Sequence, residues 1–280
     1  MRIAISHLTH YRFDNPVILN FHRLFLIPQQ RSYFTLHSGM WNVNPLPMDI
    51  SERLDAESNS YYQAWFSGET SHLDISVMLD IELKSFNPFA FILDPSLPFP
   101  FNELPYPTEL EEFLMPFRSK SPLPELEDFT RKIMAESSSI VGFLSGLLAH
   151  LHGDWVHQER EEPGILPVKQ VFDEKEGSCR DLAYMMMVML RNVGIASRFV
   201  SGYAFNQELE AGHELHAWLE AFFPGAGWIG LDPSLGLFTD QTYIPLAASY
   251  RPEFTMPVHG TYGGHASSSL QSQISIQTIG

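Results

Sequence analysis

The first third of the chain alternates between hydrophobic and polar residues. From Leu73 to Leu83 every second residue is leucine, isoleucine or valine, the spacing that places one set of side chains on one face of a β-strand. Met1 to Phe13 and Phe21 to Pro28 carry β-branched and aromatic residues and predict further strands. We therefore expect residues 1–87 to form an antiparallel sheet with one exposed face. Turns are predicted at Asn15-Pro16, Pro45-Leu46-Pro47 and Asp55 to Ser60.

Prolines then interrupt the pattern. Nine of them fall between Pro88 and Pro124, and each fixes φ and removes a backbone donor. We predict a linker without regular helix or sheet over residues 88–124. The phenylalanines and leucines among the prolines favour a linker that packs along a surface.

Beyond the linker, hydrophobic residues recur with the 3.6-residue period of helices. Predicted helices are Glu125 to Ala135, Ile140 to His152 and Arg180 to Asn192. Predicted strands follow at about Ser197 to Tyr203, Glu214 to Phe222 and Trp228 to Leu231. Helices followed by a sheet indicate an α+β core over residues 125–245. Residues 246–280, which end in sequence rich in serine, glutamine and glycine, are interpreted as a C-terminal extension.

Composition and charge narrow the function classes. The chain has 280 residues, of which 44% are hydrophobic, enough to build buried cores. Its formal charge of −16 would repel nucleic acid and anionic membranes, so neither is expected as a partner. The longest apolar stretch, Ala183 to Leu190, is far shorter than a membrane-spanning helix, which needs about 20 residues. The N-terminus lacks the apolar region of a secretory signal, which predicts a cytoplasmic protein.

Cys179 is the single cysteine, which excludes an internal disulfide and a multi-thiolate zinc site. It follows Gly177 and Ser178 and directly precedes the predicted helix that begins at Arg180. Free backbone N–H groups and the helix dipole favour a thiolate at such a position. The alternatives are a small buried hydrophobic residue and a ligand in a mixed metal site.

His216 is the histidine best placed to act as a base for this thiol. It lies in a predicted strand, on the same face as Trp218. A three-residue loop at Phe223 to Gly225 would place Asp232 directly opposite His216 in a hairpin. A carboxylate there would orient the imidazole while the second ring nitrogen takes the thiol proton. The alternatives are a structural histidine and a simple turn after the strand.

Sequence blocks around these residues resemble the transglutaminase-like core of bacterial cysteine enzymes. The blocks have the order of that family and a compatible spacing, within residues 140–245. Residues 1–87 are similar to the β-rich region that often precedes this core in bacteria. The blocks of the core are Gly177 to Ala183, Leu190 to Tyr203, His216 to Glu220 and Gly227 to Ser234, and those of the N-terminal region are His7 to Phe13 and Arg23 to Pro28.

The resemblance implies a papain-like fold and a set of catalytic residues. Cys179 would be the nucleophile, His216 the general base and acid, and Asp232 the carboxylate that orients the imidazole. The resemblance also makes Trp155 and Trp218 candidates for substrate binding or for stabilising the oxyanion. The backbone N–H of Cys179 is a further expected oxyanion donor.

Other residues near the site have a structural explanation. Arg180 and Asp181 are expected to cap and support the start of the helix rather than to contact substrate. The run His213 to His216 lacks the i, i+4 histidine spacing of a zinc protease helix, and we expect neither a metal nor a cofactor. Departures from the family pattern are Ser178, Leu182 and Asp55-Ala56-Glu57-Ser58-Asn59, a loose version of an Asp-x-x-Gly-Asn turn.

The expected chemistry is acyl transfer through a thioester, with a peptide or protein amide as substrate. We expect water as the acceptor, hence a cysteine protease or amidase. The alternatives are a protein-glutamine transglutaminase, in which an amine is the acceptor, and a non-catalytic peptide-binding module. A calcium-regulated cross-linker is not expected, because the acidic residues are spread along the chain without ligand spacing.

Overall fold

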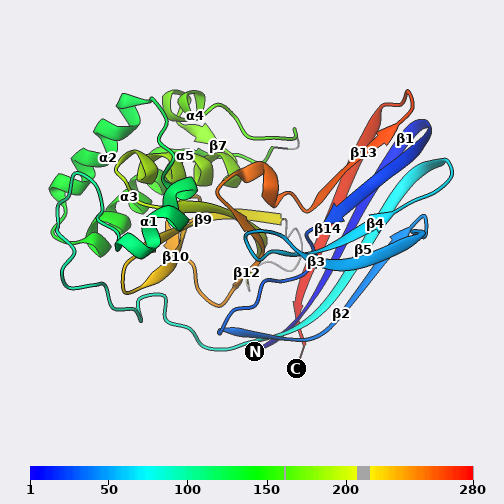
Figure 1. The fold of residues 1–280 in the computed structure, drawn as a ribbon, viewed down its shortest axis with the longest axis horizontal. Helices are drawn as coiled ribbons and strands as arrows, with labels where there is room; N and C mark the ends of the chain where they lie inside the picture. Colours follow the sequence, from blue (N-terminus) through cyan, green and yellow to red (C-terminus); the bar gives the residue numbers. More distant parts are fainter. Residues whose placement is uncertain (161, 207–214, 280) are drawn as a thin grey trace.

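The computed structural model describes residues 1–160, 162–206 and 215–279. Figure 1 shows a long antiparallel sheet on one side and a group of helices with a second sheet on the other. His213 and Glu214, which belong to the run tested for a zinc motif, lie outside the described residues. Within the described ranges, no helix is long and apolar enough to cross a bilayer.

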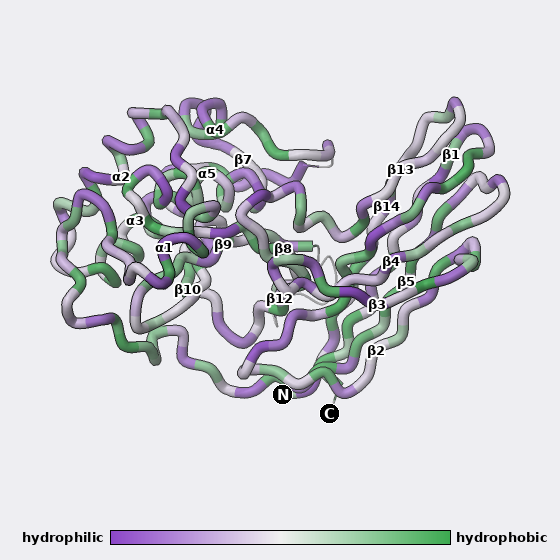
Figure 2. Tube along the Cα trace, viewed as in Figure 1, coloured by the Kyte–Doolittle hydropathy of each residue, from purple (hydrophilic) through white to green (hydrophobic). Residues whose placement is uncertain are grey.

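The N-terminal sheet has the strand order β2-β5-β1-β4-β3, and β13 and β14 also pair with β1. Its strands are β1 (Arg2–Leu24), β2 (Phe34–Asn44), β3 (Asp49–Leu54), β4 (Ser60–Trp65), β5 (Thr70–Leu83), β13 (Val258–Gly263) and β14 (Ser268–Thr278). The alternating hydrophobic residues of β5 are buried, and Figure 2 shows hydrophobic and hydrophilic residues alternating along the strands. The predicted turn at Asn15-Pro16 is wrong: β1 continues through it with a shift of register, where a strand tolerates a proline.

The end of the chain returns to this sheet. Strand β14 pairs with β1 from Ile3 opposite Thr278 to Phe13 opposite Ser268, and its isoleucines are buried. Residues 258–278, which the sequence analysis interprets as part of an extension, therefore contribute two strands beside the N-terminus. Their few hydrophobic positions give a weak local pattern, since most residues of these strands remain exposed.

The proline-rich segment contains helix despite its composition. Helix α1 (Thr108–Leu114) is followed by the 3₁₀ helix η1 (Met115–Arg118), so the prediction of no regular structure is wrong over these residues. Helix α1 begins after Pro107 and has no internal proline, which is the arrangement that a helix tolerates. The segment packs along the core as expected, because Phe101 and Leu104 are buried in its hydrophobic cluster.

Helices and a second antiparallel sheet form the core, in agreement with the α+β prediction. The helices are α2 (Pro124–Glu136), α3 (Ile140–Asp154), α4 (Val168–Glu174), α5 (Cys179–Asn192) and the 3₁₀ helix η2 (Pro252–Thr255). The sheet has the order β11-β10-β9-β8-β12. Its strands are β8 (Ser197–Ala204), β9 (Leu215–Phe223), β10 (Gly227–Asp232), β11 (Leu237–Phe238) and β12 (Tyr243–Ser249); β6 (Val156–His157) and β7 (Glu176–Gly177) form a separate parallel pair. Helix α5 contacts β9, and its leucines and methionines are buried.

The turn at Asp55 to Asn59 fastens the N-terminal sheet to the core sheet. Asn59 is fully buried; its amide donates to the Ala248 carbonyl at 2.9 Å and accepts from the Ala248 N–H at 2.8 Å. It also donates to Asp55 at 2.7 Å. Glu57 accepts the Tyr250 N–H at 3.0 Å. The turn at Asp55 to Asn59, which departs from the family pattern, therefore binds the backbone of β12.

Ser58→Gly is expected to stabilise the protein by about 0.5 kcal/mol. Ser58 has φ +64°, a left-handed conformation that glycine adopts without steric cost, and the family pattern has glycine at this position. Urea denaturation measures the difference. The control is Ser51→Gly in the extended strand β3, which is expected to lower the free energy of unfolding by about 0.5–1 kcal/mol. A loss of that size in Ser58→Gly would contradict the explanation.

Gly202→Ala is expected to destabilise the core by about 3 kcal/mol. Gly202 lies on β8 opposite His216, where an added Cβ would be 2.2 Å from the Ile244 carbonyl oxygen and 2.8 Å from the Trp218 ring. Because the first contact is with backbone, β12 would have to move. The matched control is Gly153→Ala in α3, where the added Cβ meets nothing within 4 Å. This substitution is expected to raise the free energy of unfolding by about 0.5–1 kcal/mol. Equal effects in urea denaturation would refute the steric argument.

Candidate active site

Cys179 is the first residue of α5, and it is partly exposed. Ser178 precedes it as the helix N-cap, and the backbone N–H and hydroxyl of Ser178 donate to Asp181 Oδ2 at 2.9 and 2.6 Å. At this position the N–H of Cys179 has no partner within the helix. That N–H and the positive end of the helix dipole favour negative charge on the thiol.

Asp181 and Arg180 hold the preceding loop against the start of α5. Asp181 is buried, and its carboxylate accepts from Arg160 Nε at 3.0 Å and from the Leu166 N–H at 2.8 Å. Arg180 donates to the Arg160 carbonyl at 3.1 Å. Gly177 is required by the same packing, because an added Cβ would be 2.9 Å from the Asp181 Cβ. Arg180 and Asp181 therefore have the supporting role expected from the sequence.

His216, near the start of β9, interacts with both other residues of the predicted triad. Its Nε2 donates to Asp232 Oδ2 at 2.7 Å, and its interaction with the Cys179 thiol raises the pKa of the ring. Because Asp232 occupies Nε2, Nδ1 is the nitrogen left for the thiol. The structure thus brings His216 and Asp232 into direct contact, with Cys179 close enough to influence the pKa of the imidazole.

Asp232 is fully buried and surrounded by donors. In addition to His216, the Tyr243 hydroxyl donates to Oδ2 at 2.8 Å. Oδ1 accepts from the Ser234 N–H at 2.9 Å, from the Ser234 hydroxyl at 2.6 Å and from the Leu235 N–H at 3.2 Å. Burial raises the pKa of this carboxyl, but the hydrogen bond and charge of His216 outweigh burial and hold the pKa below its usual value. Asp232 is therefore ionised and fixes the imidazole.

The hairpin between β9 and β10 has a different register from the predicted one. Leu219 pairs with Leu231, so extending the ladder places Asp232 opposite Trp218 instead of His216. The predicted register is wrong because the loop begins one residue later than expected. The shift keeps Asp232 on the same face of the sheet, and diagonal neighbours remain within reach of long side chains.

The electrostatics of the site favour a thiolate–imidazolium pair. Burial raises the pKa of Cys179, but hydrogen bonds from two histidines and from the Ala217 N–H lower it to about 6. The two histidines are His157 and His216. Burial lowers the pKa of His216, but the hydrogen bonds and charges of Asp232 and Cys179 raise it to about 10. Near pH 7 the pair is therefore ionised.

Sequence comparison assigns this site to a family. The profile of the Transglutaminase-like superfamily matches residues 127–233, which include Cys179, His216 and Asp232. Residues 127–233 are therefore a transglutaminase-like core. The profile of the bacterial transglutaminase-like N-terminal region matches residues 3–82. An uncharacterized protein from Mycobacterium tuberculosis is 25% identical over 260 residues, 87% of this chain and 82% of that protein.

Two further proteins resemble this transglutaminase-like chain. A protein-glutamine gamma-glutamyltransferase from Pseudomonas aeruginosa is 37% identical over 71 residues, which are 23% of this chain and 11% of that enzyme. The crystal structure of a candidate cysteine protease from Cytophaga hutchinsonii has a TM-score of 0.72 at 15% identity, over 100% of this chain and 92% of that chain. The predicted fold, an antiparallel β region followed by a transglutaminase-like core, is therefore confirmed.

Trp155 and Trp218 do not take the substrate-contacting positions predicted for them. Trp155 is 4% exposed, and its indole N–H donates to the Val171 carbonyl at 2.9 Å, so it is not available to an oxyanion. Trp218 is 1% exposed and stacks beside His216 with ring centroids 6.4 Å apart. Both are packing residues of the transglutaminase-like core, because large aromatic side chains near a cleft also fill its walls.

Two further residues lie at the site that no sequence pattern predicts. Tyr243, on β12, donates to Asp232, and its ring packs against Trp218 at 5.2 Å. His157, on β6, interacts with Cys179, and the thiol raises the pKa of the imidazole. The position of Tyr243 depends on β12, which reaches the site only as part of the core sheet. The position of His157 depends on β6, a strand of two residues. The presence of a histidine upstream of the nucleophile was the available signal for His157.

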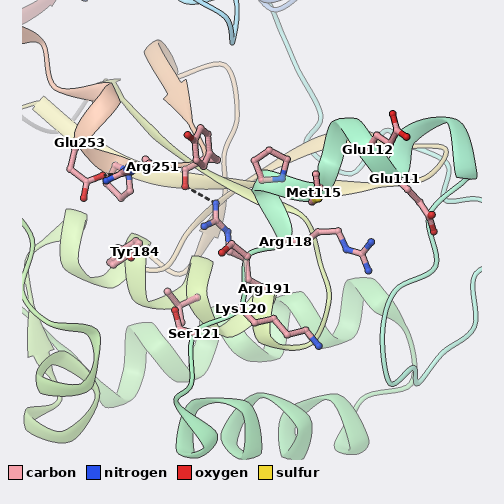
Figure 3. Close-up of a pocket in the computed structure, with 15 residues that line it drawn as sticks. Glu111, Glu112, Met115, Arg118, Lys120, Ser121, Tyr184, Arg191, Arg251 and Glu253 are labelled. Atoms are coloured by element: carbon pink, nitrogen blue, oxygen red, sulfur yellow. Dashed lines mark hydrogen bonds and ion pairs between the residues drawn. The ribbon is translucent and has the colours of Figure 1, made fainter.

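A cavity of about 990 Å³ lies beside α5 (Figure 3), and its lining does not include Cys179, His216 or Asp232. Tyr184, Val188 and Arg191 line it from α5, together with residues of η1 and η2. Arg191 donates to the Tyr250 carbonyl at 2.8 Å, the bond drawn in Figure 3. Cys179 lies at the opposite end of α5 from Arg191. In the part of the chain that the structure describes, no group of three or more histidine, cysteine, aspartate or glutamate side chains is placed to hold a metal ion.

Proposed function

We propose that the chain is a cysteine protease or amidase that cleaves an amide or peptide bond through a thioester on Cys179. The observation that carries this proposal is the hydrogen bond between His216 and the buried Asp232, beside a thiol at the start of α5. A nucleophile activated by a base, which is itself oriented by a third group, is the arrangement used for acyl transfer.

Acylation starts from the thiolate–imidazolium pair. The Sγ of Cys179 attacks the carbonyl carbon, and the π electrons of the carbonyl move to its oxygen. The N–H of Cys179, at the helix start, donates to that oxygen. When the C–N bond breaks, the amine leaves with a proton from His216. The acyl group remains on Cys179 as a thioester, and His216 is neutral.

Hydrolysis restores the starting state. Neutral His216 accepts a proton from water as the water oxygen attacks the thioester carbonyl. Collapse of the second tetrahedral intermediate expels Cys179 as the thiolate and releases the carboxylic acid. Asp232 stabilises the imidazolium and keeps the orientation of the ring in both steps.

Transfer to an amine is the second candidate function. Its support is the similarity of 71 residues to the protein-glutamine gamma-glutamyltransferase from Pseudomonas aeruginosa. The acylation step would be the same, and a primary amine would replace water in the second step. The acceptor therefore decides between the two functions, and the residues around Cys179 serve either one.

Incubation of the protein with casein and a dansylated primary amine tests both functions. Hydrolysis predicts casein fragments or released ammonia, with no dansyl label on the casein. Transfer to the amine predicts casein that carries the label. Protein alkylated at Cys179 by iodoacetamide is the matched control. If untreated protein yields neither product and its thiol reacts as slowly as a free cysteine, the chain is a peptide-binding module and the proposal is wrong.

The kcat/KM of the protein is expected to have a bell-shaped pH profile. Activity rises as Cys179 ionises with a pKa of about 6 and falls as His216 loses its proton with a pKa of about 10. Initial rates measured across both limbs check this. A single rise near pH 8.5, the pKa of an ordinary thiol, would show that the two groups are not coupled.

A further inference from the structure

Tyr243 reaches the carboxylate of Asp232 from a strand that is not a neighbour of β10. It is the first residue of β12, and β8 and β9 lie between β12 and β10 in the core sheet. Its hydroxyl donates to Asp232 Oδ2 at 2.8 Å. Tyr243 is 3% exposed, and its ring packs edge-on against Trp218, with ring centroids 5.2 Å apart. Packing therefore holds the hydroxyl at this one oxygen.

Two donors share that oxygen. Oδ2 of Asp232 accepts from His216 Nε2 at 2.7 Å and from the Tyr243 hydroxyl at 2.8 Å. The bonds to Oδ1 come from Ser234 and Leu235, in the turn that follows β10. A second donor stabilises the negative charge of Oδ2, so this oxygen becomes a weaker acceptor for an imidazolium. Tyr243 is in position to weaken the bond between Asp232 and His216 in this way.

The hydroxyl of Tyr243 acts as a neutral donor. Burial and the charge of Asp232 raise its pKa above the usual value, so the hydroxyl keeps its proton. The titratable groups that act on the imidazole are Asp232 on β10, Cys179 on α5 and His157 on β6, and Asp240 acts on Tyr243. Tyr243 therefore changes the strength of the carboxylate as an acceptor without adding a charge to the site.

The strength of this carboxylate matters most when the leaving group departs. Before attack, a basic His216 keeps the thiol ionised. After attack, the same ring gives its proton to the leaving nitrogen, and an imidazolium that is held too strongly is a poor acid. An activated ester leaves as a stable anion and does not need that proton, whereas an amide does. A weakened Asp232 therefore favours the cleavage of amides.

We propose that Tyr243 is a positioning residue that holds Oδ2 of Asp232 and limits how tightly this carboxylate retains the imidazolium, so that His216 protonates the nitrogen of an unactivated amide. The inference rests on the proposed acyl transfer at Cys179 and adds its substrate class. As the C–N bond breaks, its electron pair moves to nitrogen, and the proton passes from Nδ1 of His216 to that nitrogen. Tyr243 itself transfers no proton.

Two acylations of the same thiol test this role. Cleavage of casein amides requires a proton on the leaving nitrogen, whereas p-nitrophenyl acetate acetylates the thiol and releases p-nitrophenolate without one. Tyr243→Phe is expected to lower kcat/KM for casein by about three- to tenfold. It is expected to change the acetylation rate by less than about twofold, because Cys179 stays ionised.

The imidazole gives a second readout, which needs no substrate. In a Cys179→Ala background, the pKa of His216 followed by NMR is expected to rise by about one unit when Tyr243→Phe is added. The reason is that loss of the hydroxyl leaves Asp232 a stronger acceptor, which stabilises the protonated ring. If the pKa does not rise, the inference is wrong.

The control and the outcomes separate the two proposals. Tyr250→Phe removes a hydroxyl from the residue directly after β12, on the wall of the 990 Å³ cavity, and is expected to change neither rate. If wild-type protein neither cleaves casein nor is acetylated at Cys179, acyl transfer itself is wrong. If Tyr243→Phe slows both reactions by one factor, Tyr243 supports the fold alone and the inference is wrong. Both rates scale with the amount of folded protein, so their ratio is valid even for a less stable variant.

Discussion

Cys179→Ala is expected to lower turnover by a factor of about 10⁴–10⁶. Without Sγ no thioester forms, and the N–H groups at the start of α5 bind the carbonyl without attacking it. His216 also loses one of the two partners that raise its pKa, so the pKa of the imidazole is expected to fall. Product release measured against the wild type checks the first effect, and an NMR titration of the His216 ring checks the second.

Cys179→Ser and the melting temperature are the controls for this prediction. A serine hydroxyl occupies the same position but is not ionised near neutral pH, so we expect a loss of turnover close to that of alanine. Both variants are expected to have the melting temperature of the wild type, because the side chain is small and partly exposed. Turnover retained by folded Cys179→Ala would mean that another residue is the nucleophile.

Asp232→Asn is expected to lower kcat by about 10³–10⁴-fold. All five groups that reach the carboxylate donate hydrogen bonds, and an amide NH₂ cannot accept any of them. In the place of Oδ2, the NH₂ group would face His216 and favour the wrong tautomer of the ring. In the place of Oδ1, it would face the Ser234 N–H. Either way the negative charge is lost, the pKa of His216 falls and its ion pair with Cys179 weakens.

Asp240→Asn is the matched control. Asp240 accepts from the N–H and the hydroxyl of Thr242 at 2.8 and 2.6 Å, the same local pattern as that between Asp232 and Ser234. It makes no hydrogen bond to the imidazole, so kcat is expected to be unchanged. Equal losses of kcat in the two variants would assign the effect to the turn rather than to His216.

Parts of the fold that depend on neighbouring residues could be predicted from the sequence. The alternation over β5 and the apolar face of α5 come from residues a few positions apart, which is the range in which periodicity is informative. The hairpin prediction brought His216 and Asp232 together even with the wrong register, because a shift by two positions keeps the same face. The prediction for α1 is wrong because the prolines of this segment lie outside that helix and do not interrupt it.

The sequence by itself determined the α+β pattern and the chemistry available: one thiol at a helix start, and a histidine and a carboxylate on one hairpin. These features are local, so short-range spacing and helix geometry are enough to define them. The tertiary structure alone decided that Trp155 and Trp218 are buried, that β13 and β14 join the first sheet, and that His157 and Tyr243 reach the site. Each of these depends on elements far apart in the chain, which pack together through contacts that no local pattern encodes.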